Sequence, residues 1–451
     1  MKQSAAIAPG RLSPSEYATN FDEVKRPLEP HQALVDSSRC LFCYDAPCIE
    51  ACPTGIDIPS FIRKIGTGNL KGAAVDILSE NIMGGMCARV CPTEILCEEA
   101  CVRTASEGKP VRIGLLQRYA TDWLLGQRIQ PFQRAASSGK RVAVVGGGPA
   151  GLACAHRLAT LGHGVTVFEA KAKLAGLNEY GVAAYKTPHG FAQREVDFIL
   201  SIGGIEQRSG VALGRDVALE ALRRDYDAVF LGVGLAGTKA LGVPGENLTG
   251  VEDAVAYIER LRQAQAVSKL PVGRRVVAIG GGNTAIDIAV QAKRLGAEDV
   301  TIVYRRGPDA MSATAHEQEF AQTNGVRIKH WARPVRLLGE GNQLVAVQFE
   351  YTRVDPAGRL VGTGESFSLE ADQVFKAIGQ VLVPDPIRDG ARQVLEMQDG
   401  KIAVDAQRHT SLPGVWAGGD CVSGLDLTVQ AVQDGKVAAH AIDGWLRAGT
   451  R

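Results

Sequence analysis

The stretch RVAVVGGGPAGLACAHRLATLGHGVTVFEA, residues 141–170, decides the fold of this chain. It reads as a β-branched strand, a glycine loop, a helix and a second strand, the pattern of a βαβ unit. Gly146, Gly148 and Gly151 form G-x-G-x-x-G, which allows a tight turn, close approach of a pyrophosphate and tight helix packing. Glu169 ends the second strand, where a carboxylate can accept hydrogen bonds from ribose hydroxyls. The stretch therefore predicts a dinucleotide site in an α/β domain.

A second βαβ unit, RRVVAIGGGNTAIDIAVQAKRLGAEDVTIVYRR, occupies residues 274–306. Its loop reads G-x-G-x-x-A and is built on Gly280, Gly282 and Ala285. Asn283 and Thr284 lie where their side chains can contact phosphate. The chain is therefore predicted to hold two nucleotides.

The second strand of this unit ends differently from that of the first. Tyr304 stands where the first unit has its acid, and Arg305 and Arg306 follow. Loss of the carboxylate and gain of two guanidinium groups favour the 2′-phosphate of NADPH through charge-assisted hydrogen bonds. An arginine pair is also common at a solvated strand edge, so NADH stays open as the second nucleotide.

Eight of the ten cysteines lie between Cys40 and Cys101. One run reads C-x2-C-x4-C-x3-C-P from Cys40, and a second, C-P-x4-C-x3-C, follows Cys87. In a reducing cytosol thiols are not kept as structural disulfides, which points to metal or redox chemistry. A structural zinc ion carries no electrons, whereas [4Fe–4S] clusters are each held by four thiolates and do. The cysteine runs therefore predict clusters beside a nucleotide-dependent reductase.

Charge and hydropathy narrow the possible partners. Lys and Arg number 50 against 49 Asp and Glu, so a formal charge of +1 leaves no electrostatic footprint for nucleic acid or an anionic membrane. No uncharged apolar run reaches the ~20 residues of a membrane span. The first residues, MKQSAAIAPGRL, lack the apolar core of a signal peptide. We therefore expect a cytoplasmic protein whose partner is neither nucleic acid nor a membrane.

The stretch TSLPGVWAGGD, residues 410–420, resembles the second FAD fingerprint of the two-dinucleotide-domain flavoprotein reductases. The resemblance implies that Asp420 holds the ribityl chain. It also implies that Thr428 opens a closing helix whose positive end points at the flavin. No Cys-x4-Cys pair stands beside the first glycine loop, which argues against a disulfide reductase, and Cys154 and Cys421 are expected to be packing residues.

Seven motifs extend the resemblance over the whole chain. They are CLFCYDAPCIEACP, IDIPSFIRKIGTGNLKGAA, CARVCPTEILCEEACV, IGLLQRYATD, GGGPAGL, AGLNEYG and YRRG. Together they resemble the FAD and iron–sulfur subunit of bacterial NAD(P)-dependent dihydropyrimidine dehydrogenase and the N-terminal half of the fused animal enzyme. The related glutamate synthase small subunit shares the first cysteine run and both glycine loops, but usually has a shorter spacing than that from Cys91 to Cys97.

This resemblance implies an α/β fold with two Rossmann-like dinucleotide-binding domains, the NAD(P) domain inserted in the FAD domain, preceded by an α-helical ferredoxin-like iron–sulfur domain. VFLGVG, residues 229–234, and VFKAIGQ, residues 374–380, look like the strands at which the insertion begins and ends. The expected domains are a helical part with two [4Fe–4S] clusters (1–135), an FAD domain in two parts (136–268 and 381–451) and an NAD(P)H domain (269–380).

The resemblance also implies a crossed set of cluster ligands. One cluster is expected on Cys40, Cys43, Cys48 and Cys101, and the other on Cys52, Cys91, Cys97 and Gln117. In the alternative, Gln117 is a polar helix residue and Cys87 is the eighth ligand; we favour Gln117. Further cofactor contacts are expected at Pro149, Ala150, Gly176, Leu177, Lys186, Gly419, Ala377 and Gly379. Where the animal enzyme has a further basic residue for the 2′-phosphate, this chain has Ser312, which weakens the prediction of NADPH.

The function implied is electron input. NAD(P)H would reduce FAD, and the clusters would pass electrons to a partner subunit holding FMN and iron–sulfur clusters, which reduces uracil or thymine to the 5,6-dihydro form. The cofactors carry this chemistry, so no catalytic side chain is expected. Three alternatives stay open: a glutamate synthase small subunit, a free-standing NAD(P)H:acceptor iron–sulfur flavoprotein, and a mainly structural cluster-bearing assembly subunit.

Overall fold

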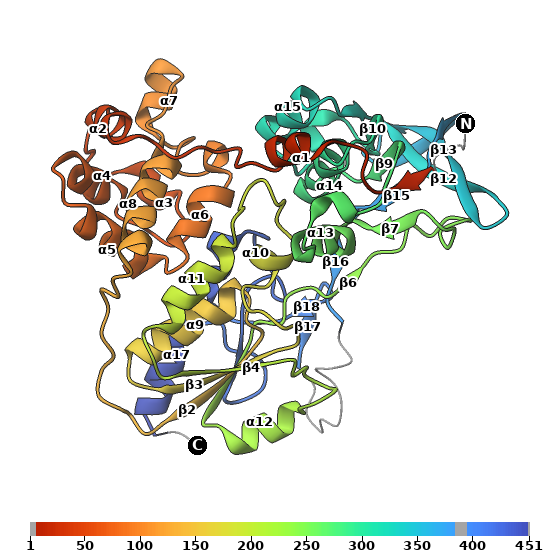
Figure 1. Ribbon diagram of the computed structural model, residues 1–451. Coiled ribbons are helices and arrows are strands. Elements are labelled where there is room, and N and C mark those ends of the chain that lie inside the picture. The colour runs from red at the N-terminus through yellow and green to blue at the C-terminus, as the bar shows by residue number, and fades with distance from the viewer. Residues whose placement is uncertain (1–5, 384–394, 450–451) are drawn as a thin grey trace. The chain divides into compact units, whose positions relative to one another are not determined.

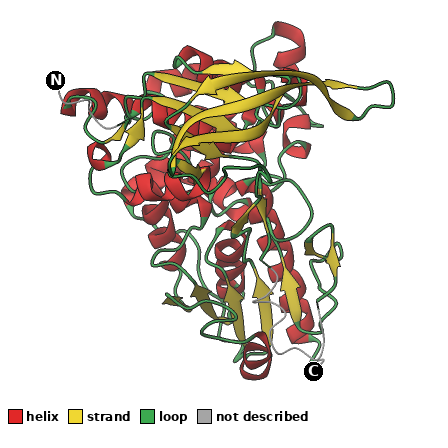
Figure 2. Ribbon diagram, turned by 90° about the vertical axis from the view of Figure 1, so that its right-hand side faces the viewer, coloured by secondary structure: helices red, strands yellow, loops and turns green. Residues whose placement is uncertain are grey.

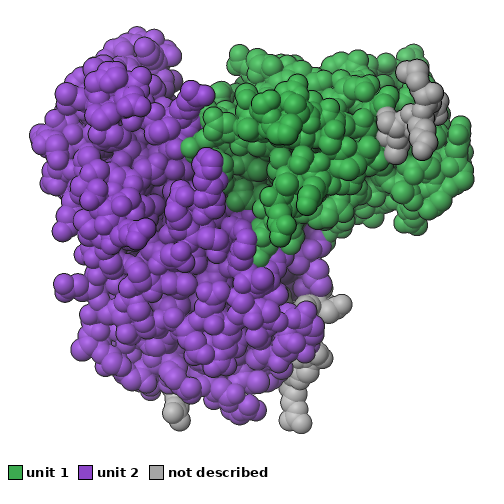
Figure 3. All heavy atoms as spheres, in the orientation of Figure 1, with its two compact units in different colours: residues 1–24, 180–188, 238–381 green, residues 25–179, 189–237, 382–451 purple. Residues whose placement is uncertain are grey.

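The computed structural model describes residues 6–383 and 395–449. The chain divides into two compact units, coloured separately in Figure 3. The first unit comprises Met1–Val24, Tyr180–Pro188 and Thr238–Val381, and the second comprises Lys25–Glu179, His189–Gly237 and Leu382–Arg451. Each unit contains a five-stranded parallel sheet.

The sheet of the second unit has the strand order β19-β5-β2-β3-β4. Its strands are β2 (Arg141–Val145), β3 (Gly164–Glu169), β4 (Ile205–Ser209), β5 (Ala228–Leu231) and β19 (Val415–Ala417). Val142 and Val144 face one core, with α9 (Pro149–Thr160) and α17 (Thr428–Arg447), while Ala143 and Val145 face another. Alternate residues of a strand point to opposite faces, so the sheet is buried on both sides. The order reverses between β2 and β5, the topological switch point at which such sheets bind ligands.

The N-terminal part of the second unit is helical (Figure 1). Its helices are α2 (Pro30–Ser38), α3 (Pro47–Glu50), α4 (Ile58–Gly66), α5 (Leu70–Glu80), α6 (Gly84–Val90), α7 (Val102–Glu107) and α8 (Ile113–Gln127), with a 3-10 turn at Thr93–Ile95. Asp57 and Asn69 accept hydrogen bonds from backbone N–H groups in the first turns of α4 and α5, the expected role of such residues before a helix. Ile58, Phe61 and Ile65 recur at helical spacing and face the core.

The first unit layers helices, a parallel sheet and an antiparallel sheet, as Figure 2 shows. The parallel sheet has the order β11-β10-β9-β15-β7, with β7 (Val251–Asp253), β9 (Arg275–Ile279), β10 (Asp299–Val303), β11 (Arg327–Lys329) and β15 (Gln373–Lys376). Val276 and Ala278 pack with the helices α13 (Ala254–Gln263), α14 (Asn283–Arg294) and α15 (Ala315–Thr323). Val277 and Ile279 pack against β12 (Ala332–Glu340), β13 (Gln343–Val354) and β14 (Leu360–Glu370).

Smaller elements complete the two units. They are β1 (Ile7–Ala8), α1 (Pro14–Asn20), α10 (Leu177–Tyr180), α11 (Phe191–Leu200), α12 (Leu219–Asp225), β6 (Gly237–Thr238), β8 (Val272–Gly273), β16 (Gln380–Val381), β17 (Met397–Gln398) and β18 (Lys401–Ile402), with 3-10 turns at Val267–Lys269 and Pro308–Ala310. The predicted α/β fold with two Rossmann-like units and a helical N-terminal part is confirmed. The four domain boundaries stay a prediction. In the described part of the chain no helix is both long and apolar enough to cross a membrane.

Helices α9 and α17 cross at a glycine. A Cβ atom added at Gly435 of α17 would lie 2.1 Å from the carbonyl oxygen of Ala150 and 2.9 Å from the backbone nitrogen of Cys154, both on α9. Only a residue without a side chain lets the two backbones approach this closely. The crossing joins the closing helix to the helix that follows the first glycine loop.

We expect Gly435→Ala to lower the free energy of unfolding by about 1–3 kcal/mol, because the added methyl group overpacks this contact. Gly444→Ala on the same helix is the matched control, since its added Cβ meets no atom within 4 Å. It should stabilise the helix by up to about 1 kcal/mol. Urea unfolding followed by circular dichroism measures both variants, and equal behaviour of the two would contradict the role of the crossing.

Candidate functional site

The first glycine loop lies at the switch point of the second unit's sheet. Gly146 has φ of +98°, and a Cβ atom there would lie 2.2 Å from the carbonyl oxygen of Gly232, just after β5. At Gly151 a Cβ would lie 1.9 Å from the carbonyl oxygen of Gly146. Helix α9 starts after Gly148 with no side-chain cap among the described residues, which leaves its first N–H groups to an anion. The loop has the shape and polarity of a pyrophosphate cradle.

Glu169 is tied to this loop by hydrogen bonds. One carboxylate oxygen accepts from the backbone N–H of Gly147 at 2.8 Å, and the other accepts from that of Lys171 at 2.8 Å. The carboxylate is thereby held at the end of β3, beside the loop. This is the position from which it could receive ribose hydroxyls.

Other predicted contacts of the first nucleotide gather at the same loop. At Gly176, which has φ of +52°, a Cβ would lie 2.9 Å from the Cα of Gly148. A Cβ on Gly419 would lie 3.0 Å from that of Ala150, and Leu177 begins α10. Helix α17 begins at Thr428, whose hydroxyl donates to the side-chain oxygen of Asn178 at 2.9 Å.

Two acids near the C-terminus, Asp420 and Asp434, differ in their contacts with the protein. Asp434, which the sequence reasoning missed, accepts from the backbone N–H of Gly419 at 2.9 Å and pairs with Arg408 at 2.7 Å. Asp420 has neither a hydrogen bond nor an ion pair within the described ranges, and burial, with Asp426 next, raises its pKa to about 6. A half-buried carboxylate without a partner among the described residues fits a role in receiving ligand hydroxyls. Asp434 could have been suspected from sequence as an acid on the inner face of an amphipathic helix.

The second glycine loop repeats this geometry in the first unit. A Cβ at Gly280 would lie 2.1 Å from the carbonyl oxygen of Ala377, just after β15, as Gly146 lies against the residue after β5. The ring of Tyr304 covers Gly281, where a Cβ would meet it at 2.5 Å. Helix α14 begins at Asn283 and continues through Thr284 and the fully buried Ala285. Gly282 borders Ser312, whose hydroxyl oxygen would lie 3.1 Å from an added Cβ.

The arginine pair beside this loop is exposed. Neither Arg305 nor Arg306 has an ion pair with any described residue, so both guanidinium groups are available to a phosphate. The carbonyl oxygen of Arg305 accepts from the hydroxyl of Thr352 at 2.7 Å, which fixes the backbone below the side chains.

Lys186 lies in the first unit with two acids of that unit. Its ammonium group pairs with Asp287 at 2.9 Å and Glu317 at 2.8 Å. Burial opposes its charge, but the two carboxylates outweigh burial and raise the pKa of Lys186. Lys186, which was predicted to contact a cofactor, thus forms ion pairs with two acids of the protein. Gly379, another predicted contact, follows β15 with φ of +100°.

The cysteines line two cavities in the helical part. The first cavity has the thiols of Cys40, Cys43, Cys48 and Cys101, with apolar side chains of α4 and of the segment before α8. Burial, followed by the neighbouring thiols of Cys40 and Cys101, raises the pKa of Cys48 to about 12. The four thiols are close enough to repel one another as thiolates.

The second cavity is lined by Cys52, Cys87, Cys91, Cys97 and Gln117. A hydrogen bond with Cys87, followed by burial, raises the pKa of Cys91, and burial raises that of Cys97. Gln117 is nearly buried on α8 and donates to the carbonyl oxygen of Gly84 at 2.7 Å. Both predicted candidates for the eighth ligand therefore face the same space.

The thiols surround these cavities rather than meeting at a point. Among the described residues no three His, Cys, Asp or Glu side chains converge closely enough to hold one metal ion. Several thiolates around one low-polarity space repel each other strongly unless cations lie between them. The irons of a [4Fe–4S] cluster, bound by four thiolates, supply that charge, so the donor sets fit clusters.

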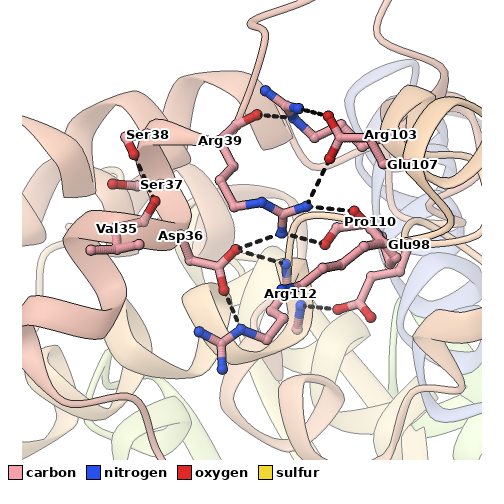
Figure 4. Close-up of polar contacts among 12 residues, drawn as sticks. Val35, Asp36, Ser37, Ser38, Arg39, Glu98, Arg103, Glu107, Pro110 and Arg112 are labelled. Carbon is pink, nitrogen blue, oxygen red and sulfur yellow. Dashed lines mark hydrogen bonds and ion pairs between the residues drawn. The ribbon is translucent and has the colours of Figure 1, made fainter.

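A polar network lies beside the first cavity (Figure 4). Asp36 on α2 is 2% exposed and pairs with Arg39 and Arg112. Arg39 also donates to the carbonyl oxygens of Pro110 at 2.7 Å and Lys109 at 2.5 Å. The network ties α2, which leads into the first cysteine run, to the chain before α8, which lines the same cavity.

Helix α6, which carries Cys87, is held from α11. The backbone N–H of Met86 donates to the carboxylate of Glu195 at 2.9 Å, and Gly85 allows this approach because a Cβ there would lie 2.9 Å from the same oxygen. Burial raises the pKa of Glu195 to about 7. A buried acid thus caps the helix that borders the second cavity.

Helix α17 reaches the second cavity as well. Val429, its second residue, lines that cavity beside Gln117. Further along, Lys436 donates to the carbonyl oxygen of Thr54 at 2.7 Å and pairs with Glu80 at 2.7 Å. The helix that starts beside the first glycine loop therefore also packs on the cysteine-bearing part.

Comparison with known proteins agrees with this arrangement. Residues 17–129 match the family described as dihydropyrimidine dehydrogenase domain II, 4Fe-4S cluster, and residues 140–435 match the pyridine nucleotide-disulphide oxidoreductase family. The NAD-dependent dihydropyrimidine dehydrogenase subunit PreT of Salmonella typhimurium is 35% identical, over 94% of this chain and 97% of that protein. The glutamate synthase [NADPH] small chain of Escherichia coli is 33% identical, over 94% of each.

A solved structure shows the same fold in part. The oxidoreductase FprA of Mycobacterium tuberculosis, in a His57Gln mutant, superposes with a TM-score of 0.57 at 22% identity, covering 69% of this chain and 86% of FprA. The sequence identities of 35% and 33% to the two relatives extend over 94% of this chain and show its family. The chain belongs to the family of NAD(P)H-dependent oxidoreductases with FAD and [4Fe–4S] clusters that includes the PreT subunit of dihydropyrimidine dehydrogenase.

Proposed function

We propose that the chain is the electron-input subunit of a dihydropyrimidine dehydrogenase. It takes electrons from NAD(P)H and delivers them to a partner subunit that holds FMN and iron–sulfur clusters and reduces uracil or thymine. When bound, FAD accepts a hydride and releases electrons singly, which is the form in which clusters carry them. The chain's own residues bind the nucleotides at the two glycine loops and keep the thiol cavities next to the flavin-binding part.

One observation carries this proposal: Val429, near the start of α17, lines the second thiol cavity. The N-terminus of α17 lies beside Asn178 and so beside the loop that contains Gly176. The second cavity is therefore the one next to the flavin-binding residues, while the first cavity is lined only by residues 39–113. The raised pKa of Cys97, to which Cys48 contributes, indicates that the two cavities are neighbours. Electrons would pass from the flavin to the second cavity and then to the first.

The proposal includes the crossed ligand set. Cys40, Cys43, Cys48 and Cys101 would hold the first cluster, and Cys52, Cys91, Cys97 and Gln117 the second. The FAD domain would comprise residues 136–268 and 381–451, and the NAD(P)H domain residues 269–380. The lining of the two cavities supports the division of the thiols into these two sets.

We expect Cys87→Ala to keep both clusters, because Gln117 is the eighth ligand. Iron analysis of anaerobically purified protein should give about eight irons per chain for this variant and about four for Cys91→Ala, the matched control in the same cavity. Gln117→Ala should also lose the second cluster. A fall to about four irons in Cys87→Ala would make Cys87 the ligand and Gln117 a helix residue.

Arg305 is proposed to recognise the 2′-phosphate of NADPH. Arg305→Ala should raise KM for NADPH about tenfold or more, the worth of a charge-assisted hydrogen bond, with little change for NADH. Arg353→Ala, which removes another exposed arginine of the same unit, is the control. Equal increases in KM for both nucleotides would show that Arg305 does not recognise the 2′-phosphate. A wild-type enzyme that uses NADH in place of NADPH would contradict this role as well.

The function itself is tested by identifying the partner. The tagged chain is purified anaerobically from its native cells, and proteins present in stoichiometric amount are identified by mass spectrometry. An FMN-containing subunit is expected, together with NAD(P)H-dependent reduction of uracil by the complex. The chain alone should reduce artificial acceptors such as ferricyanide but no pyrimidine.

The similarity to the glutamate synthase small chain makes that enzyme the second candidate. A large glutaminase-bearing partner would establish it and overturn the pyrimidine assignment. Clusters that stay oxidised when NAD(P)H is added would instead favour a structural role for them.

A further inference from the structure

Exposed apolar residues lie in the lining of the first thiol cavity and in the chain next to it. We call this group of residues the exit patch and define it by Leu34, Val35, Leu41, Tyr44 and Val102. Leu41 and Val102 line the cavity itself and are 60% and 37% exposed. Tyr44 is fully exposed, and Leu34 and Val35 are exposed on α2, one turn before Arg39, which also lines the cavity.

Part of the exit patch lies in the loop that carries the first cysteine run. Leu41 and Tyr44 stand in the loop between Cys40 and Cys48, both of which face inward to the cavity. The guanidinium of Arg63 lies over the ring of Phe42, 4.5 Å from its centroid, so Phe42 is packed while Leu41 and Tyr44 are exposed. Large apolar side chains gathered on one surface mark an interaction site. Tyrosine is among the residues enriched at the centres of protein interfaces.

The charge around the exit patch is acidic. The two cysteine runs, residues 40–52 and 91–101, contain five carboxylates and no Lys or Arg. Asp45, Glu50 and Glu99 are exposed. Against these stand the exposed Lys109, Arg63 and Arg112, of which Arg112 is paired with Asp36. Arg39 and Arg103 are half-buried and bound within the region, and Glu107 adds a further exposed carboxylate. The surface therefore complements a partner with basic groups at its rim.

We propose that the exit patch is the docking face for the electron-accepting redox subunit, whose own face is apolar at its centre and basic at its rim. The proposal rests on the proposed function, in which the first cavity is the last station before the partner. Electrons leave a buried cluster only over short distances, so the acceptor has to sit on the surface next to that cavity. Leu41 and Val102 line the cavity and are exposed, so the cavity reaches the surface at the exit patch.

The test measures binding rather than turnover. The redox subunit that copurifies with the wild-type chain at low salt is identified, purified and titrated against holo-protein by biolayer interferometry. Tyr44→Asp should weaken the complex at least about tenfold, because it places a charge at the apolar centre. Asp45→Lys should lower the association rate and flatten its dependence on salt. Val354→Asp, at an exposed apolar residue of β13 in the other unit, is the control and should bind as wild type.

Iron and flavin contents confirm that each variant is folded and loaded. Wild-type affinity for Tyr44→Asp and Asp45→Lys would overturn the docking face whatever the partner is. Weakened binding of a redox subunit that lacks FMN would support the docking face and overturn the pyrimidine function. Self-association of the wild-type chain that Tyr44→Asp abolishes would assign the exit patch to a second copy instead, and absence of any redox subunit at low salt would overturn both proposals.

Discussion

The crossing of α9 and α17 is the contact on which the electron-transfer part of the structure depends. It is possible only because Gly435 has no side chain to meet the carbonyl oxygen of Ala150. Through it, one helix that begins at Thr428, beside Asn178 and the loops proposed to bind the flavin, also borders the second thiol cavity at Val429. Lys436 then fastens the same helix to Thr54 and Glu80 of the helical part. Nucleotide binding and cluster binding are thus built on one shared helix rather than on a flexible linker.

A second constraint comes from the thiols. Bringing four of them to one largely apolar cavity costs free energy as soon as they ionise, and the raised pKa values of Cys48, Cys91 and Cys97 express that cost. The folded protein holds them there with contacts that involve no thiol at all. Asp36 fastens α2 through Arg112, and Glu195 caps α6. These contacts hold the elements that carry or border the thiols, and cluster binding would add its own free energy to the stability of this part of the fold.

The sequence predicts most of the fold because its strongest signals are local. Both βαβ units, both glycine loops and the start of the closing helix at Thr428 follow from spacing within short segments. The pairings of Asp36 with Arg112 and of Glu195 with Met86 escaped prediction because the partners are distant in the sequence. In the antiparallel strands β12–β14, apolar residues such as Val347 and Phe349 alternate on one face, which is typical of a strand. This pattern does not indicate which sheet the strands pack against.

The two glycine loops have the same backbone packing but different surrounding side chains. In each, the first glycine lies against a carbonyl group just after the neighbouring strand, that of Gly232 or Ala377. The backbone at the first loop is bonded to the carboxylate of Glu169, whereas the second loop is covered by Tyr304 and followed by exposed guanidinium groups. Because the loop geometry is common, the choice of nucleotide falls on side chains at the ends of β3 and β10. An acid fixed by hydrogen bonds would repel a 2′-phosphate. Arginines that have no ion pair with any described residue would attract one, so we propose that charge makes the two sites prefer different nucleotides.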